Sequence, residues 1–526
     1  MNTTVHQQTW KGLLGLLSLV LLLQQVACTG TKKQTETTKV DEELTFQILQ
    51  INDVYEIAPL EGGKVGGMAR VAQVKKELLA ENPNTIAVMA GDFLNPSVMG
   101  VLKYQGERIK GKQMIEAMNA AGIDLATFGN HEFDLKEAEL LKRVEESDFA
   151  WTIANVFHQK EKETKNTVFQ HRGKDIPPYH IETFTDSDGT TLKVAFISVC
   201  LNSNQPDYVV YDDPFEAFEA NYLAAQKEAD VVIGLTHQNI EEDMQLAKQH
   251  PELPLIMGGH EHHNMLHTIG KVIITKADAN AKSAYVHKIS HNKTTGQTQV
   301  NSSLKKIDET VAKEEATDLV VQKWMKITQD VLQESGINPN EVVMKLKEPL
   351  DARESLIRHK TSPIAELIAK AMRVTYPDEA QGAILNTGSI RMDDLLTGQV
   401  TQYDIVRLLP YGGGVQLVEL KGNLILDILK AGKTQNVSKG GFLVASNLTY
   451  DTANHTGTIG DAAIEADTYY KVTFPDYLML GLEQNLGFLK PDHPDIKSVY
   501  VPKKEEELRN DVRLAVVDYM QKNGVE

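Results

Sequence analysis

Cysteine and positive charge are both scarce in this sequence of 526 residues. Lys and Arg total 54 against 72 Asp and Glu, so the net charge is -18. Nucleic acid is therefore not an expected partner, because phosphate backbones bind to basic surfaces. A small anionic substrate stays open, since a local cationic site can override the overall charge.

Long apolar runs are lacking except at the N-terminus, where residues 12–23 are almost all Leu, Val and Gly. That run is too short to span a bilayer, and Lys11 precedes it, so residues 1–27 are expected to be a signal peptide. The polar residues 28–43 are expected to form a flexible tether. The C-terminus also lacks a hydrophobic tail, which argues against a glycolipid anchor.

The two cysteines are Cys28 and Cys200. Ala27 before Cys28 is typical of bacterial lipoproteins, so lipid attachment to Cys28 and ordinary export are both open. With Cys28 lipidated or removed, no disulfide within the chain is expected. The protein is expected in the periplasm or cell envelope, with membrane contact only through such a lipid.

Strands and amphipathic helices alternate across residues 44–302, which indicates a layered α/β domain. Apolar spacing between residues 311 and 332 predicts a long helix, which Gly336 and Pro339 would end. The expected domains are 44–308 and 341–526, with residues 309–340 as a linker helix. A hydrophobic content of 41% is enough for more than one buried core.

Polar motifs follow apolar stretches that read as buried strands. Because ligands bind where the strands of open α/β sheets end, these motifs predict one shared site. The motifs are Ile51-Asn52-Asp53, Gly91-Asp92, Gly129-Asn130-His131-Glu132, Thr236-His237 and Gly258-Gly259-His260-Glu261-His262.

Carboxylates and imidazoles of this kind are the ligands of a two-metal phosphoesterase. Asp92 is expected to bridge the metals, because a carboxylate offers two oxygens. The other ligands divide between two shells, with Asn130, His237 and His260 in one and Asp53 and His262 in the other. A lone Gly-Asp is usually a turn, so the prediction depends on the motifs occurring together and in order.

His131 is expected to be catalytic. If a helical turn starts there, Asp134 accepts a hydrogen bond from the imidazole and holds it protonated toward the leaving oxygen. The predicted mechanism is in-line attack by metal-bound hydroxide, with His131 stabilising the leaving group.

These motifs resemble those of the 5′-nucleotidase family of calcineurin-like metallophosphoesterases over nearly the whole mature chain. The resemblance implies a four-layer α/β/β/α sandwich followed by a smaller α+β C-terminal substrate-binding domain. The family's first motif is Asp-x-His, which Asp53 matches and Tyr55 does not. Three readings of Tyr55 stay open: a phenolate ligand, a gap filled by water, or a residue that only packs at the strand end.

The resemblance extends to the substrate pocket. It implies that Tyr411 and Phe488 sandwich a base, while Arg391 and one or both of Arg353 and Arg358 hold the phosphate. The motifs that carry it are Asn386-Thr387-Gly388-Ser389-Ile390-Arg391, Pro410-Tyr411-Gly412 and Asn485-Leu486-Gly487-Phe488. Asn386 opens the first of these and is expected to contact substrate.

The expected function is hydrolysis of nucleoside phosphates with two divalent metal ions drawn from Zn, Mn, Co or Fe. Two alternatives stay open. One is a phosphohydrolase for nucleotide-sugars, cyclic nucleotides or other phosphoesters, and the other is a surface nucleotide-binding protein whose metal site has decayed at Tyr55.

Overall fold

A computed structural model describes residues 43–159, 167–503 and 507–524. The expected signal peptide and nearly all of the expected tether, including Cys28, lie outside these residues. Among the described residues, none of the helices combines the length and apolar character needed to cross a membrane.

The N-terminal domain contains two sheets of six strands each. Parallel strands form the centre of each sheet, so their carboxyl ends meet at one edge. The first sheet has the order β18 (Gln297–Lys306), β17 (Ser283–Asn292), β1 (Glu43–Ile51), β2 (Thr85–Met89), β5 (Leu125–Ala126), β6 (Ala150–Trp151). The second has the order β10 (Tyr179–Thr185), β11 (Thr191–Cys200), β13 (Val231–His237), β14 (Leu255–Gly258), β16 (Val272–Lys276), β15 (Met265–Ile269).

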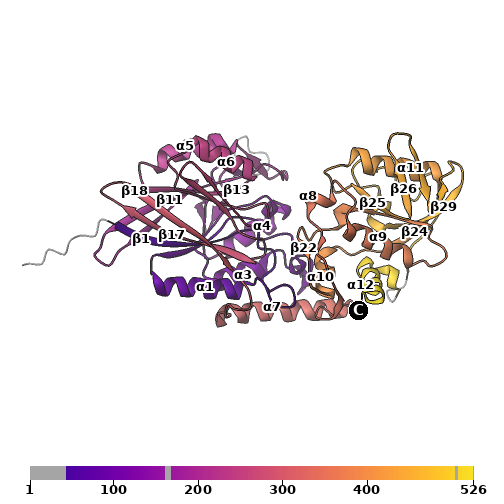
Figure 1. Cartoon of the computed structure of the whole chain (residues 1–526), viewed down its shortest axis with the longest axis horizontal. Coiled ribbons are helices and arrows are strands. Elements are labelled where there is room, and N and C mark those ends of the chain that lie inside the picture. Colours follow the sequence, from indigo (N-terminus) through magenta and orange to yellow (C-terminus); the bar gives the residue numbers. More distant parts are fainter. Residues whose placement is uncertain (1–42, 160–166, 504–506, 525–526) are drawn as a thin grey trace, which may run out of the picture. The chain divides into compact units, whose positions relative to one another are not determined.

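Helices cover the outer faces of both sheets, as Figure 1 shows. On one side lie α1 (Met68–Glu81), α3 (Lys112–Ala121) and α7 (Glu315–Glu334), and on the other α5 (Pro214–Ala225) and α6 (Ile240–Gln249). Three apolar layers hold this arrangement together, and Val71, Phe196 and Phe218 are buried in the first, middle and third of them. The expected four-layer α/β/β/α sandwich is therefore confirmed.

Strand β1 shows how one sequence serves two of these layers. Phe46 and Ile48 point into the middle layer between the sheets, whereas Leu49 and Ile51 pack beneath the helices. Successive side chains of a strand point to opposite faces, so a strand buried on both sides reads as a continuous apolar run.

Helix α7 lies within the segment where a long helix is expected, but it begins at Glu315 rather than near Val311. The Glu314 carboxylate accepts a hydrogen bond from the Thr317 backbone N–H at 2.8 Å and caps the helix there. The helix ends at Glu334, and Gly336 follows with a positive φ of 77°. Glycine adopts this left-handed conformation readily, so it suits a position just after a helix.

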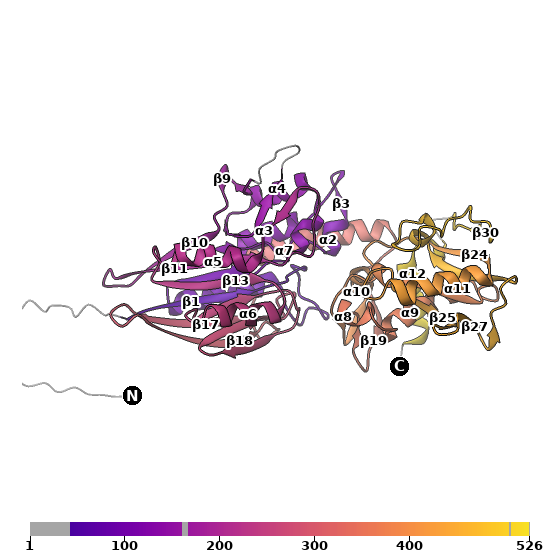
Figure 2. The ribbon, with the colours of Figure 1, turned by 90° about the horizontal axis from the view of Figure 1, so that it is seen from above.

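The C-terminal domain is built on a mixed sheet (Figures 1 and 2). One face of the sheet packs against α9 (Pro363–Val374) and α12 (Val512–Asn523), and the other against α11 (Gly422–Lys430). This is the expected α+β architecture. The strand order is β25 (Leu443–Ser446), β21 (Gly382–Asn386), β29 (Tyr469–Pro475), β24 (Val415–Lys421), β30 (Ile496–Tyr500).

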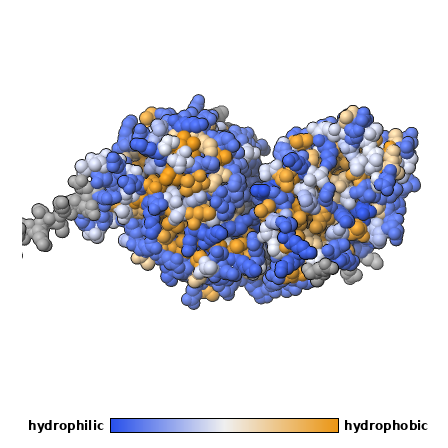
Figure 3. Space-filling model, in the orientation of Figure 1, coloured by the Kyte–Doolittle hydropathy of each residue, from blue (hydrophilic) through white to orange (hydrophobic). Residues whose placement is uncertain are grey.

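On the face drawn in Figure 3, hydrophilic residues spread across the surface and hydrophobic residues form smaller areas between them. Large apolar side chains with high exposure, such as Leu223, Leu319 and Leu482, lie on separate elements.

Candidate metal centre and substrate cavity

The predicted motifs lie at the carboxyl ends of the parallel strands. Asp53 follows β1, Asp92 follows β2, and Asn130 comes four residues after β5. In the second sheet His237 ends β13, and the loop after β14 carries His260 and His262. The two sheets therefore deliver acidic and imidazole side chains to one region.

Four of these residues have backbone conformations that non-glycine residues rarely adopt. The φ angles are 53° at Asp53, 56° at Asp92, 94° at His260 and 61° at His262. Such strained residues persist only where the surrounding structure holds them, and they cluster at functional sites. Four residues with positive φ therefore gather at this one site.

Gly129 and Gly259 leave room for the ligands to approach. A Cβ atom at Gly129 would lie 2.2 Å from Asp92 Oδ1, and one at Gly259 would lie 2.5 Å from the Ala90 carbonyl oxygen. Real Cβ atoms do not tolerate such distances. Glycine therefore fits at these two motif positions because a larger residue would clash with its neighbours.

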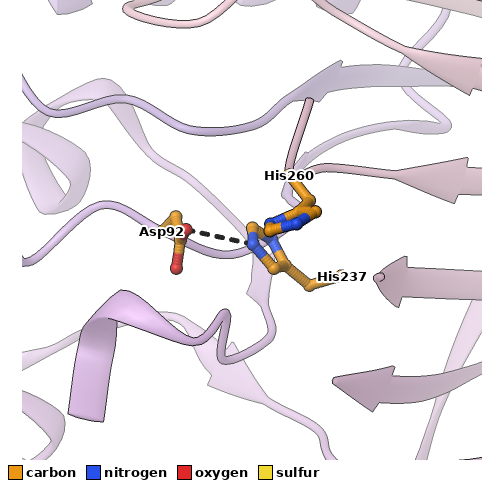
Figure 4. Close-up of side chains that lie close together, drawn as sticks. All are labelled: Asp92, His237 and His260. Carbon is orange, nitrogen blue, oxygen red and sulfur yellow. Dashed lines mark ion pairs between the residues drawn. The ribbon is translucent and has the colours of Figure 1, made fainter. Parts of the chain in front are cut away.

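Asp92, His237 and His260 form a cluster in which the ligand atoms all lie within 4.8 Å of one another (Figure 4). His237 Nε2 is 3.0 Å from Asp92 Oδ2 but is not aligned for a hydrogen bond. His237 Nδ1 lies 2.8 Å from the Ala90 carbonyl oxygen, to which it donates, so deprotonation of the ring leaves the lone pair on Nε2.

Asn130 comes directly before His131, whose backbone N–H donates a hydrogen bond to Asp92 Oδ1 at 2.7 Å. The Oδ1 atom of Asn130 is buried without a hydrogen-bond partner, and buried polar atoms normally have one. A bound cation would satisfy this oxygen. The donor set therefore fits a divalent metal ion, as the prediction for Asn130, His237 and His260 requires.

Asp53, Tyr55 and His262 form a second group beside the first. His262 Nε2 lies 3.4 Å from Asp53 Oδ1 and 2.9 Å from the Tyr55 hydroxyl oxygen. The Tyr55 hydroxyl is also 3.3 Å from Asp92 Oδ2, so Asp92 faces both groups. This placement suits the bridging role expected of Asp92.

The electrostatics of Asp92 and His260 match what metal binding needs. Burial alone would lower the pKa of His237, but the charge of Asp92 raises it to about 9, so a metal ion has to displace a proton there. Burial would raise the pKa of Asp92, but the nearby His237 and His131 lower it below the ordinary value. Burial, together with the charge of His237, lowers the pKa of His260 to about 4. The carboxylate is therefore ionised and the imidazole neutral near pH 7, which are their metal-binding forms.

His131 and Asp134 are paired as the sequence predicts. His131 Nδ1 lies 2.7 Å from Asp134 Oδ2 within a short helical turn (His131–Asp134). Burial alone would lower the pKa of His131, but the charge of Asp92 and the hydrogen bond to Asp134 raise it to about 9. Asn95 and Asn204, which the sequence did not single out, each donate a hydrogen bond to Asp134.

Glu132 is a supporting residue that the sequence reasoning missed, although it lies inside a quoted motif. Its buried carboxylate accepts hydrogen bonds from four backbone N–H groups, those of Asp92, Phe93, Leu94 and Gly129. Burial and the charge of Asp92 raise its pKa to about 7. Glu132 thus ties the loop after β2 to the loop after β5.

Asp393 is a second residue that the sequence reasoning missed. Its Oδ2 atom lies 3.0 Å from His262 Nδ1, and its Oδ1 atom accepts a hydrogen bond from the Glu354 backbone N–H. This carboxylate orients His262 so that Nε2 faces Asp53. The sequence signal that could have pointed to Asp393 is its acidic side chain two positions after Arg391, the last residue of a quoted motif.

Arg391 connects the metal centre to the substrate side. It lines a small cavity together with His131, His262 and Asp393. It also lines a second cavity of about 800 Å³, a volume typical of small-molecule sites. The Arg391 guanidinium lies 5.8 Å from the centre of the Tyr411 ring, which borders the same second cavity.

The second cavity contains Asn386 and Tyr411, as expected, but its other aromatic side chain is Tyr477. Phe488 is not among the lining residues, and its ring is 6.3 Å from that of His493. The stacking role of Phe488 stays a prediction. Sequence reasoning missed Tyr477 because it lies outside the motifs.

Arg353 and Arg358 are engaged in ion pairs beside the cavities. Arg353 Nη2 pairs with Asp351 Oδ2 at 2.6 Å, and the buried Arg358 pairs with Glu354 and donates to Thr387 Oγ1. Neither lines the cavities that Arg391 borders. Their expected contact with phosphate stays a prediction.

The fold and this residue cluster define a metallophosphoesterase. The family model for calcineurin-like phosphoesterases matches residues 46–264, and the model for the 5′-nucleotidase C-terminal domain matches residues 342–488. The chain therefore combines a calcineurin-like metallophosphoesterase domain with a C-terminal domain of the 5′-nucleotidase type. This fold implies divalent metal ions.

Similar proteins match this chain over nearly its whole length. A 5′-nucleotidase from Vibrio cholerae is 23% identical over 547 residues, which cover 91% of this chain and 92% of that protein. The crystal structure of a 5′-nucleotidase precursor from Thermus thermophilus has a TM-score of 0.63 at 19% identity, covering 92% of this chain and 97% of that one. The sulfate thiohydrolase SoxB of Thermus thermophilus has a TM-score of 0.59 at 15% identity, covering 91% and 94%.

Proposed function

We propose that the protein hydrolyses nucleoside phosphates in a metal-dependent reaction of the 5′-nucleotidase type, releasing phosphate and nucleoside. The observation that carries this proposal is the Asp92, His237 and His260 cluster with the unpartnered Asn130 oxygen. The 5′-nucleotidases among the similar proteins support a nucleotide as substrate.

In this proposal two metal ions are held by the two groups of side chains that share Asp92. Such ions stabilise negative charge on a phosphoryl group and make water a stronger nucleophile. His131 borders the small cavity and holds its proton at Nε2 while Nδ1 bonds to Asp134. It donates that proton to the leaving oxygen of the nucleoside.

The larger cavity would hold the nucleoside. A base needs flat apolar surfaces, which Tyr411 and Tyr477 offer at this cavity. Because Arg391 borders both cavities, its guanidinium can bind the phosphate while the base occupies the larger one. This arrangement favours a phosphate joined to a nucleoside over a free phosphate.

The test is phosphate release by the purified full chain supplied with Mn²⁺, Zn²⁺ or Co²⁺. AMP and a UDP-sugar are compared as substrates, with Asp92→Asn as the inactive control. Release from AMP that depends on the metal supports the proposal. Release from the UDP-sugar alone favours the phosphoester alternative, and nucleotide binding without any release favours the binding protein.

We also propose that the protein is exported, on the support of the apolar residues 12–23 after Lys11. Lipid on Cys28 would then anchor it in the cell envelope. Mass spectrometry of the protein from membranes tests this: a lipidated N-terminal Cys28 supports the anchor, and an unmodified N-terminus in the soluble fraction contradicts it. In Cys28→Ala the membrane-bound fraction should fall.

A further inference from the structure

Tyr55 takes the place of the histidine in the Asp-x-His motif of the family, and its hydroxyl lies among the expected metal ligands. The residue is 6% exposed. Its hydroxyl oxygen is 2.9 Å from His262 Nε2, 3.3 Å from Asp92 Oδ2 and 3.5 Å from Asp53 Oδ1. Tyr55 therefore does not merely pack at the strand end.

The two carboxylate distances are long for hydrogen bonds, since O–H···O bonds usually measure about 2.5–3.0 Å. They suit ligands that share a cation. With metal–ligand bonds of about 2.0–2.2 Å, neighbouring ligands at tetrahedral or octahedral angles lie about 2.8–3.6 Å apart. The three hydroxyl distances and the 3.4 Å between His262 Nε2 and Asp53 Oδ1 all fall in that range.

The rest of the Tyr55 side chain is held in place. The Asn280 side-chain oxygen accepts a hydrogen bond from the Tyr55 backbone N–H at 3.2 Å. The ring centre lies 5.3 Å from that of His262 and 6.3 Å from that of His131, which stands edge-on. The hydroxyl is thus aimed at the ligand group by its surroundings.

We propose that Tyr55 is a direct metal ligand through its phenolate oxygen, and that this makes one of the two metal positions selective for a hard cation such as iron(III). The phenol proton passes to solvent as the cation binds. The proposal rests on the metal-dependent function above, but its test does not depend on hydrolysis.

The two positions differ in ligand chemistry as a result. Asp53, Asp92 and Tyr55 give the first position three anionic oxygens beside one imidazole, that of His262. The second position shares Asp92 and otherwise offers neutral ligands, which are Asn130, His237 and His260. Hard anionic oxygens favour small, highly charged cations, whereas imidazole suits zinc and similar divalent ions.

The test uses the full chain, stripped of metal with a chelator and reloaded with iron(III) as its citrate complex. A phenolate bound to iron(III) absorbs visible light by charge transfer, and free phenol does not. The wild-type protein should bind iron and show this band. Tyr55→Phe should lose the band and bind iron(III) at least about tenfold more weakly.

Two further variants complete the design. Tyr55→His restores the family's imidazole, so it should also lose the band but bind Zn²⁺ or Mn²⁺ more tightly than the wild type does. Tyr285→Phe is the matched control, because Tyr285 is another buried tyrosine of this domain and is not among the residues placed at the metal centre. It should keep the band. Circular dichroism checks that all three variants are folded.

The proposal is overturned if wild-type protein binds no iron(III), or binds it without the visible band. It is also overturned if Tyr55→Phe keeps both the band and the affinity. These results are independent of the hydrolysis assay. If the protein shows the band but releases no phosphate from AMP, Tyr55 is a metal ligand and only the proposed function is wrong.

Discussion

Replacing Glu132 with Gln tests how the metal-binding loops are held. Each oxygen of the buried carboxylate accepts two hydrogen bonds: Oε1 from Phe93 and Leu94, and Oε2 from Asp92 and Gly129. In Gln one of these oxygens becomes an NH₂ group, which cannot accept. Two buried backbone N–H groups then lose their acceptor and face another donor.

A buried donor left without a partner costs about 1–3 kcal/mol. Glu132→Gln should therefore lower the free energy of unfolding by about 2–6 kcal/mol, and it should loosen the backbone at Asp92. The assay is urea unfolding of the metal-free protein at about pH 8, above the pKa of about 7 that burial and Asp92 give Glu132.

Glu139→Gln is the matched control. Its carboxylate accepts a backbone hydrogen bond from Lys136 N–H in an exposed capping position, and an amide oxygen can replace it. The control should change stability by less than about 0.5 kcal/mol. Equal stability of Glu132→Gln and wild type would refute the reasoning that Glu132 holds these loops together.

His131→Ala should lower kcat by about 10²–10⁴-fold with little change in KM, because the substitution removes the proton donor to the leaving group. Steady-state kinetics with AMP test this prediction, and an unchanged kcat would contradict it. Tyr411→Ala should raise KM by about tenfold or more and leave kcat nearly unchanged, since stacking contributes about 1–3 kcal/mol per base. Equal losses in both constants for both variants would contradict the separate roles. Gly129→Ala should lower metal affinity by about 10–100-fold, because the new Cβ would displace Asp92. Competition with a chelating dye measures the affinity, and an affinity equal to that of the wild type would contradict this prediction.

The expected metal ligands can be picked out from the sequence because they follow parallel strands. Asp92 and His237 are 145 residues apart, but each lies at the carboxyl end of an apolar parallel strand, β2 in the first sheet and β13 in the second. The alternation of strands and helices predicts a layered α/β domain, whereas the four layers are implied only by the resemblance to the family.

The remaining features depend on contacts that no local pattern encodes. Glu132 matters because four N–H groups converge on it, and Asp393 matters because a distant loop brings it to His262. Tyr477 lines the cavity from a short turn after β29, which has no periodic signal. Such contacts require the tertiary structure.

The metal content of the full chain tests the central claim most directly. Elemental analysis of wild-type protein should find about two metal ions per chain, as expected of a two-metal site. Asp92→Asn should hold fewer than one and release no phosphate from AMP, because Asp92 faces both ligand groups. Full hydrolysis by protein that holds no metal would contradict the account.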